Sequence, residues 1–91
     1  MAWQAVFNNP RQPRGRVVPA ETLQLGDVVS FYPYAPHTAE VIGDREPVQD
    51  RFSRDLFRYR MRIISGPNRI GDEGYHLYGP GGKARVVKRA R

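Results

Sequence analysis

The sequence predicts an all-β protein, a small barrel of five short strands preceded by an extended basic arm. Residues 56 to 64, LFRYRMRII, alternate apolar and arginine side chains, as expected for a strand that buries one face. The 91 residues include 9 glycines and 8 prolines, which favours short elements joined by turns. No long window shows helical periodicity, so strands are the elements left to form a core.

The chain divides into an arm, residues 1–16, and a barrel domain, residues 17–91. Trp3, Ala5 and Phe7 recur at every second position and predict a short strand. Residues 8–16, NNPRQPRGR, contain no apolar side chain, so we expect an extended and mobile segment.

The five strands of the barrel follow from β-branched and aromatic runs between turn residues. They are expected near residues 28–31, 38–42 and 56–64 and in a hairpin over residues 75–90 with Gly79-Pro80-Gly81-Gly82 at its tip. Residues 46–53 predict one helical turn begun by Pro47. The predicted core contains the apolar face of residues 56–64 and its partners, namely Phe57, Tyr59, Met61, Ile63, Val28, Phe31, Val41 and Val86.

The stretch PAETLQLGDVVSF at residues 19–31 resembles the opening of SH3-like small barrels of the Tudor and KOW type. The residues that carry the resemblance are the run LQLGDVV, residues 23–29, and the order of the strands after it. The resemblance covers about residues 17–90 and implies a small barrel. Barrels of this kind bind nucleic acid, methylated or proline-rich peptides, or other proteins, so the fold alone leaves the function open.

The net charge is +6, with a pI near 10.3, which indicates an acidic partner such as nucleic acid. A GC-rich genome would also enrich arginine, which supplies all the basic residues except Lys83 and Lys88. The charge is segregated along the chain. Residues 21–55 carry seven acids against three arginines, whereas residues 56–91 carry nine basic residues against Asp72 and Glu73. Codon usage does not explain such segregation.

Several function classes have no support in the sequence. The absence of cysteine excludes disulfides and thiolate metal sites, and His37 and His76 lie far apart in the chain. No nucleophile–base pair, phosphate loop or spaced carboxylate pair is present, so we expect no enzyme, no metal and no cofactor. No apolar run is long enough for a membrane span or a signal peptide. We therefore expect a soluble, cytoplasmic protein without membrane contact.

The candidate nucleic-acid-binding residues are basic. On a strand, Arg58, Arg60 and Arg62 share one face. That face is either ion-paired with acids of neighbouring strands such as Glu40, or a stripe that binds phosphates, or a surface that docks an acidic protein. The terminal strand and the arm add further cations, and the full set is Arg14, Arg16, Arg58, Arg60, Arg62, Lys83, Arg85, Lys88 and Arg89.

In the arm, Pro13-Arg14-Gly15-Arg16 resembles the core of AT-hook peptides. The resemblance implies two arginines along an A·T-rich minor groove, with glycine allowing close approach of the backbone. A plain basic linker is the alternative.

A second candidate set is aromatic and is expected near strand ends. Exposed rings there would stack on nucleic-acid bases or hold a peptide, and the alternative is that they pack as part of the core. Its members are Tyr32, Tyr34, Tyr75 and Tyr78.

The sequence thus predicts a non-enzymatic binding module whose partner is nucleic acid, either DNA or RNA. The first alternative is a protein-interaction adaptor for an acidic or proline-rich partner, contacted through the loop FYPYAPH and the arginine face. The second is a small accessory or assembly protein, for example of a virus, in which acidic residues 40–55 of one copy contact basic residues 58–91 of the next.

Overall fold

The computed structural model describes residues 15–49, 51–52 and 55–90, and the described part is all-β. The predicted strand in residues 2–7 and the mobile arm lie outside the described residues, except for Gly15 and Arg16. One short 3-10 helix, η1 (Ala20–Thr22), follows the first strand. The strands are β1 (Arg16–Pro19), β2 (Val28–Ser30), β3 (Thr38–Val41), β4 (Glu46–Gln49), β5 (Asp55–Ser65), β6 (Glu73–Tyr78) and β7 (Lys83–Lys88).

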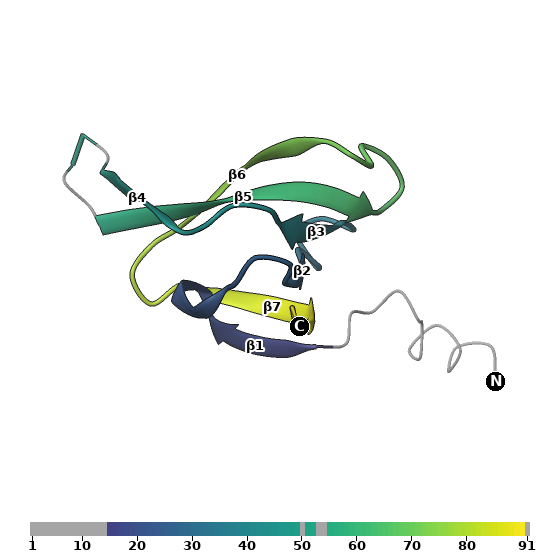
Figure 1. Cartoon of the computed structure of the whole chain (residues 1–91), viewed down its shortest axis with the longest axis horizontal. Helices are drawn as coiled ribbons and strands as arrows, with labels where there is room; N and C mark the ends of the chain where they lie inside the picture. The colour runs from purple at the N-terminus through teal and green to yellow at the C-terminus, as the bar shows by residue number, and fades with distance from the viewer. Residues whose placement is uncertain (1–14, 50, 53–54, 91) are drawn as a thin grey trace.

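All strand pairs are antiparallel and form one open sheet in the order β1-β7-β2-β3-β5-β4, with β6 on the other edge of β5. The sheet therefore has seven strands where five were expected, and its pairing does not close into a ring. Figure 1 shows the strand order in space: β5 and β6 run along the upper side of the molecule, and β1 and β7 run along the lower side.

The predicted hairpin at residues 75–90 is wrong, although its turn is present. Gly82 N–H donates to the Gly79 carbonyl at 3.0 Å, and Gly81 has a φ of 73°. The strands on either side then separate, because β6 pairs with β5 whereas β7 pairs with β1 and β2. Ala20 N–H donates to the Gly82 carbonyl at 2.9 Å, so this turn is fastened to η1 as the chain crosses between the two sides of the sheet.

The predicted helical turn at residues 46–53 is also wrong, since Glu46–Gln49 is strand β4. Its four residues lie opposite Arg58, Phe57, Leu56 and Asp55 at the first part of β5. Pro47 is compatible with this position because β4 has no partner on its other side in the described sheet. Pairing with a long neighbouring strand overrides the weak local preference for a turn.

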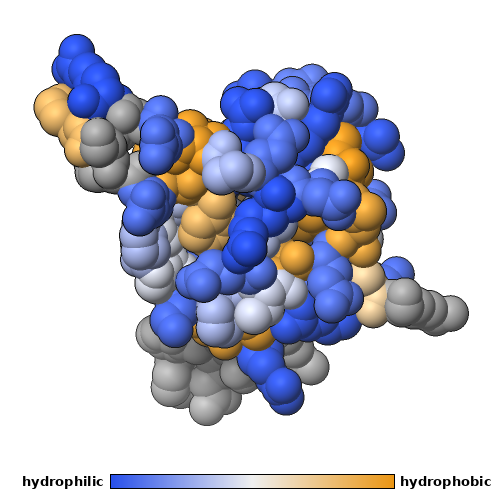
Figure 2. Space-filling view, turned by 60° about the vertical axis from the view of Figure 1, so that its left-hand side comes forward, coloured by the Kyte–Doolittle hydropathy of each residue, from blue (hydrophilic) through white to orange (hydrophobic). Residues whose placement is uncertain are grey.

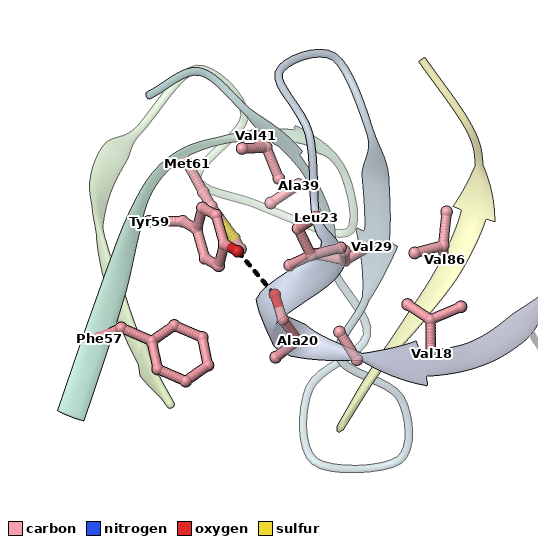
Figure 3. Close-up of a cluster of buried hydrophobic side chains, with 11 residues drawn as sticks. Val18, Ala20, Leu23, Val29, Ala39, Val41, Phe57, Tyr59, Met61 and Val86 are labelled. Carbon is pink, nitrogen blue, oxygen red and sulfur yellow. Dashed lines mark hydrogen bonds between the residues drawn. The ribbon is translucent and has the colours of Figure 1, made fainter. Parts of the chain in front are cut away.

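The core confirms the face of residues 56–64 that was expected to be buried. Phe57, Tyr59 and Met61 are buried, while Ile63 is half-buried near the end of β5. Figure 3 shows Phe57, Tyr59 and Met61 pointing toward η1 and β2. The Tyr59 hydroxyl donates to the Ala20 carbonyl at 2.7 Å, which satisfies the one polar atom of a ring that is 1% exposed.

Val28 is buried as predicted, but it lies outside the hydrophobic cluster, which contains its neighbour Val29. Val41 and Val86 belong to the cluster as predicted, and Phe31 packs against it while remaining half-buried. Because neighbouring residues of a strand point to opposite faces, Val28 and Ser30 lie on the outer face of the sheet.

Candidate nucleic-acid interface

The three arginines of β5 form one row on the outer face of the sheet. Arg58, Arg60 and Arg62 alternate with the buried residues of the strand, and their side chains are between 37% and 50% exposed. Arg58 and Arg62 are two strand repeats apart, a separation of about 13 Å. The prediction that the three share one face away from the core is confirmed.

This β5 arginine row (Arg58, Arg60 and Arg62) is ion-paired. The Arg58 Nε lies 2.9 Å from a carboxylate oxygen of Glu46 on β4. Glu73 on β6 accepts hydrogen bonds from Arg60 at 2.8 Å and from Arg62 at 3.3 Å. Three guanidinium groups thus face two carboxylates, which neutralise most of the charge that the row presents to solvent.

The electrostatic consequence is clearest at Glu73. Hydrogen bonds from Arg60 and then Arg62 lower the pKa of this carboxyl below its usual value. The same contact raises the pKa of Arg60, mainly through its hydrogen bond with Glu73. Each group therefore favours the charged form of the other.

The carboxylates that neutralise the row are only partly the ones expected. Glu46 on β4, which follows β3 in the chain, is the partner of Arg58. Glu40 lies opposite Arg62 in the β3–β5 register, but it forms no ion pair among the described residues. Glu73, the partner of Arg60 and Arg62, was not expected. The signal for it was its position at the start of an alternating run, where the register places it opposite Arg62.

A second set of cations lies on β7 and has no acid partner in the described part of the chain. Arg85 lies opposite Ser30, and Lys88 lies opposite Val28 across a shift in register between Val28 and Val29, so both share the outer face with these residues. Lys83 is two residues from Arg85 and points to the same side. Lys83, Arg85 and Lys88, here called the β7 basic row, thus present three positive charges along one strand. Lys83 and Lys88 are exposed and Arg85 is half-buried.

Arg89 does not join that row. Its guanidinium donates to Oδ2 of Asp27 at 2.8 Å, and the Asp27 side chain is 0% exposed. Asp27 also accepts hydrogen bonds from the backbone N–H of Gln24 at 2.9 Å and of Ala90 at 2.7 Å. The charge of Arg89 is therefore used inside the domain, where it fastens the segment after β7 to the turn before β2.

The arm residues fall in different places. Arg14 lies outside the described residues, and Arg16 begins β1 opposite Val86. Gly15 has a φ of 145°, and a Cβ atom there would collide with the carbonyl oxygen of Val86. A glycine is therefore required at this position by the close approach of the chain to β7. The AT-hook resemblance assigned that role to DNA, whereas the fold accounts for Gly15 by itself.

The aromatic candidates separate into exposed and packed rings. Tyr34 is 96% exposed and Tyr32 is 47% exposed, both in the loop between β2 and β3. The Tyr78 ring packs against Phe57 at 5.7 Å and Tyr59 at 6.1 Å between ring centroids. Tyr78 is therefore half-buried against the core, and this burial raises the pKa of its hydroxyl to about 12.

Tyr75 belongs to the outer face together with the β5 arginine row. The guanidinium carbon of Arg58 lies 3.9 Å from the centroid of its ring, a cation–π contact. On the inner face, His76 contacts the ring of Phe31 at 4.9 Å, so this pair connects the end of β2 to β6. Burial lowers the pKa of His76, which is therefore neutral at pH 7.

Comparisons with protein-family models, with curated proteins and with solved structures gave no match. In residues 15–49, 51–52 and 55–90, no three His, Cys, Asp or Glu side chains come together as a metal ion would need. The same part of the chain has no helix long and apolar enough to cross a membrane.

Proposed function

We propose that the protein is a non-enzymatic module that binds the phosphate backbone of nucleic acid through the β7 basic row. The observation that carries the proposal is the contrast between two rows of cations. The β5 arginine row is neutralised by Glu46 and Glu73, whereas Lys83, Arg85 and Lys88 have no carboxylate partner among the described residues. An unpaired row of cations along an exposed strand attracts a row of phosphates without the loss of internal ion pairs.

Further positive charge lies near this surface. Arg16 begins β1, the strand that borders β7, and has no acid partner in the described structure, although its register opposite Val86 places it on the other face of the sheet from Arg85. Arg11 and Arg14 precede it in the sequence without an intervening acid. The positive charge of the N-terminal region is thus continuous along the chain with that of β1, the strand that borders β7.

We further infer that the open sheet is a variant of the SH3-like small barrel. The supporting observations are that β7 returns to lie between β1 and β2, and that η1 lies directly after β1. The rings of Phe31, after β2, and His76, on β6, are in contact, so side chains connect these two strands although their backbones do not pair. Nucleic-acid binding is one of the functions that barrels of this class support.

The test is affinity for duplex DNA and for RNA over a salt series. We expect micromolar binding at low salt and a linear fall of log affinity with log salt. Replacing Lys83, Arg85 and Lys88 together by glutamine should flatten the slope by about 3 units on duplex DNA, at about 0.9 per phosphate contact. The matched control replaces Arg58, Arg60 and Arg62 by glutamine. It removes the same charge from the β5 arginine row, and the slope should change by less than about 1 unit.

Two results would contradict the proposal. The first is equal flattening by the two triple variants, which would show that only net charge matters. The second is the absence of binding to DNA and RNA at low salt. The adaptor function would then take its place, since Tyr34 is 96% exposed in a loop that also contains Pro33 and Pro36. Replacing Tyr32 and Tyr34 by alanine and measuring retention of an acidic or proline-rich peptide tests that alternative.

A further inference from the structure

Three strands of the described sheet have a free edge, namely β1, β4 and β6. Two of them carry residues that oppose addition of another strand. Pro47 lies within β4, and β1 contains Arg16 and ends at Pro19. By contrast, β6 is six residues long, EGYHLY, and has no proline, lysine or arginine. Figure 1 shows β6 along the upper border of the molecule, with no other labelled strand beyond it.

The backbone groups on the free edge of β6 follow from its register. Ile63 N–H donates to the Asp72 carbonyl at 2.9 Å, and Gly71 N–H donates to the Ile63 carbonyl at 2.8 Å. The alternation of an antiparallel pair then makes Gly74 and His76 the residues that hydrogen-bond to β5. The N–H and C=O groups of Tyr75 and Leu77 therefore point away from β5 and lack a strand partner in the described sheet.

Beyond Glu73, which is ion-paired with Arg60 and Arg62, the outer-face side chains of this strand are those of Tyr75 and Leu77. Tyr75 is 46% exposed and Leu77 is 50% exposed, and both lie on the outer face with Arg58 and Arg60. Figure 2 shows hydrophobic atoms between hydrophilic ones on one face of the molecule, so exposed apolar groups are separated rather than gathered in one large patch. On the inner face, a Cβ atom added to Gly74 would meet nothing within 4 Å.

We propose that β6 pairs with β6 of a second copy of this chain, antiparallel and about a two-fold axis at His76. In this register Tyr75 lies opposite the partner's Leu77, and the two exchange backbone hydrogen bonds on each side of the axis. Tyr78 lies opposite the partner's Gly74, which has no side chain to collide with the packed Tyr78 ring. A shift by two residues places Leu77 opposite the partner's Glu73 and loses both matches. The strand is therefore self-complementary in one register, as a symmetric dimer requires.

This inference goes beyond the proposed function, because it uses β6 and leaves the β7 basic row free. Neither strand pairs with the other. A dimer formed through β6 would carry two such rows, but its existence depends only on the edge and the side chains of β6.

The first experiment is sedimentation velocity from about 10 μM to about 1 mM protein. We expect a concentration-dependent dimer. Leu77→Lys should raise the dimer dissociation constant at least about tenfold, since a symmetric interface contains the change twice. The matched control is Leu25→Lys, in the turn before β2, where leucine is 51% exposed and β6 is not involved. The control should dimerise like the wild type. A wild type that stays monomeric at about 1 mM, or a Leu77→Lys variant that dimerises unchanged, overturns the proposal.

The second experiment tests the register. The chain has no cysteine, so His76→Cys introduces a single thiol. In the proposed pairing the two residues at position 76 form a non-hydrogen-bonded pair with Cα atoms about 4.5 Å apart, within the range of a disulfide. Mild oxidation should convert this variant to a covalent dimer, while Leu25→Cys stays monomeric under the same conditions. Equal cross-linking of both variants, or none at position 76, overturns the register.

Discussion

The guanidinium of Arg89 donates a hydrogen bond to the fully buried carboxylate of Asp27, and the two residues are 62 positions apart in the chain. Asp27 also accepts from the backbone of Gln24 and Ala90. One carboxylate thus connects the turn before β2 with the last described residues of the chain. The Gly-Asp pair in the run LQLGDVV therefore has a structural role at Asp27 besides its role in the turn.

Removal of this contact should lower the stability of the domain. We expect Arg89→Gln to reduce the free energy of unfolding by about 1.5 to 3 kcal/mol, because a hydrogen bond to a buried charge is lost. Lys88→Gln is the matched control, since Lys88 is exposed and has no acid partner in the described structure, and it should change stability by less than about 0.5 kcal/mol. Urea unfolding of both variants measures the difference. Equal effects would show that the buried carboxylate does not need its cation.

The Met61→Ala variant tests the packing of the hydrophobic core. Met61 is 5% exposed and lies between β3 and the centre of the cluster, so Met61→Ala should cost about 2 to 5 kcal/mol through lost burial and a residual cavity. Ile64→Ala serves as the control, because Ile64 is 41% exposed on the same strand, and it should cost less than about 1 kcal/mol. Thermal unfolding followed by circular dichroism compares the two. A core that tolerates Met61→Ala as well as Ile64→Ala would contradict this packing.

The ionisation of Tyr78 predicts how stability depends on alkaline pH. Burial raises its pKa to about 12 in the folded protein, above the value of 10.0 for a free tyrosine. The unfolded chain therefore loses this proton first. The contribution of neutral Tyr78 is complete below pH 10.0 and is lost as the pH rises toward about 12. Unfolding curves between these pH values should show a decline that is smaller in Tyr78→Phe. Tyr59, whose pKa is also raised by burial, accounts for part of the remaining decline.

The lowered pKa of His76 predicts how the stability of the folded protein depends on acidic pH. Burial lowers the pKa of His76 below 6.5, so the unfolded state binds a proton at a higher pH than the folded state. The stabilisation is complete above pH 6.5 and falls as the pH decreases toward the folded-state pKa. Proton chemical shifts of the His76 ring over a pH series give that pKa directly. A value at or above 6.5 would mean that the ring is solvated rather than packed against Phe31.

The Glu73→Gln variant tests whether ion pairs with carboxylates keep the β5 arginine row from binding phosphates. Glu73→Gln removes the carboxylate that binds Arg60 and Arg62. If this face is within reach of bound duplex DNA, the salt dependence of binding should steepen by up to about 2 units, at about 0.9 per freed cation. Asp72→Gln is the charge-matched control, because Asp72 binds Arg69 in the neighbouring turn. An unchanged slope in both variants would place the β5 arginine row away from the phosphates.

Local patterns in the sequence were sufficient to predict the all-β class and the buried face of β5. Alternation along LFRYRMRII separates Phe57, Tyr59 and Met61 from the three arginines by strand geometry alone, before any partner strand is known. The alternation that predicts the buried face depends only on residues that are close in sequence. The pairing of β3 with β5 was expected from the strand order of a small barrel, and the structure has it with β4 between the two strands in the chain.

The tertiary structure decided which strands pair with each other and which acids lie beside each basic residue. Residues 46–49 became a strand because β5 extends far enough to pair with them, and β6 and β7 separated because each found a different partner strand. The chemistry of the basic residues was decided in the same way. In the sequence, Arg60, Lys83 and Arg89 are equivalent cations. In the folded chain, Arg60 lies beside Glu73 and Arg89 lies beside buried Asp27, whereas Lys83 has no acid beside it among the described residues. Ion pairing depends on distances of a few ångströms across the sheet, and only the folded chain sets those distances.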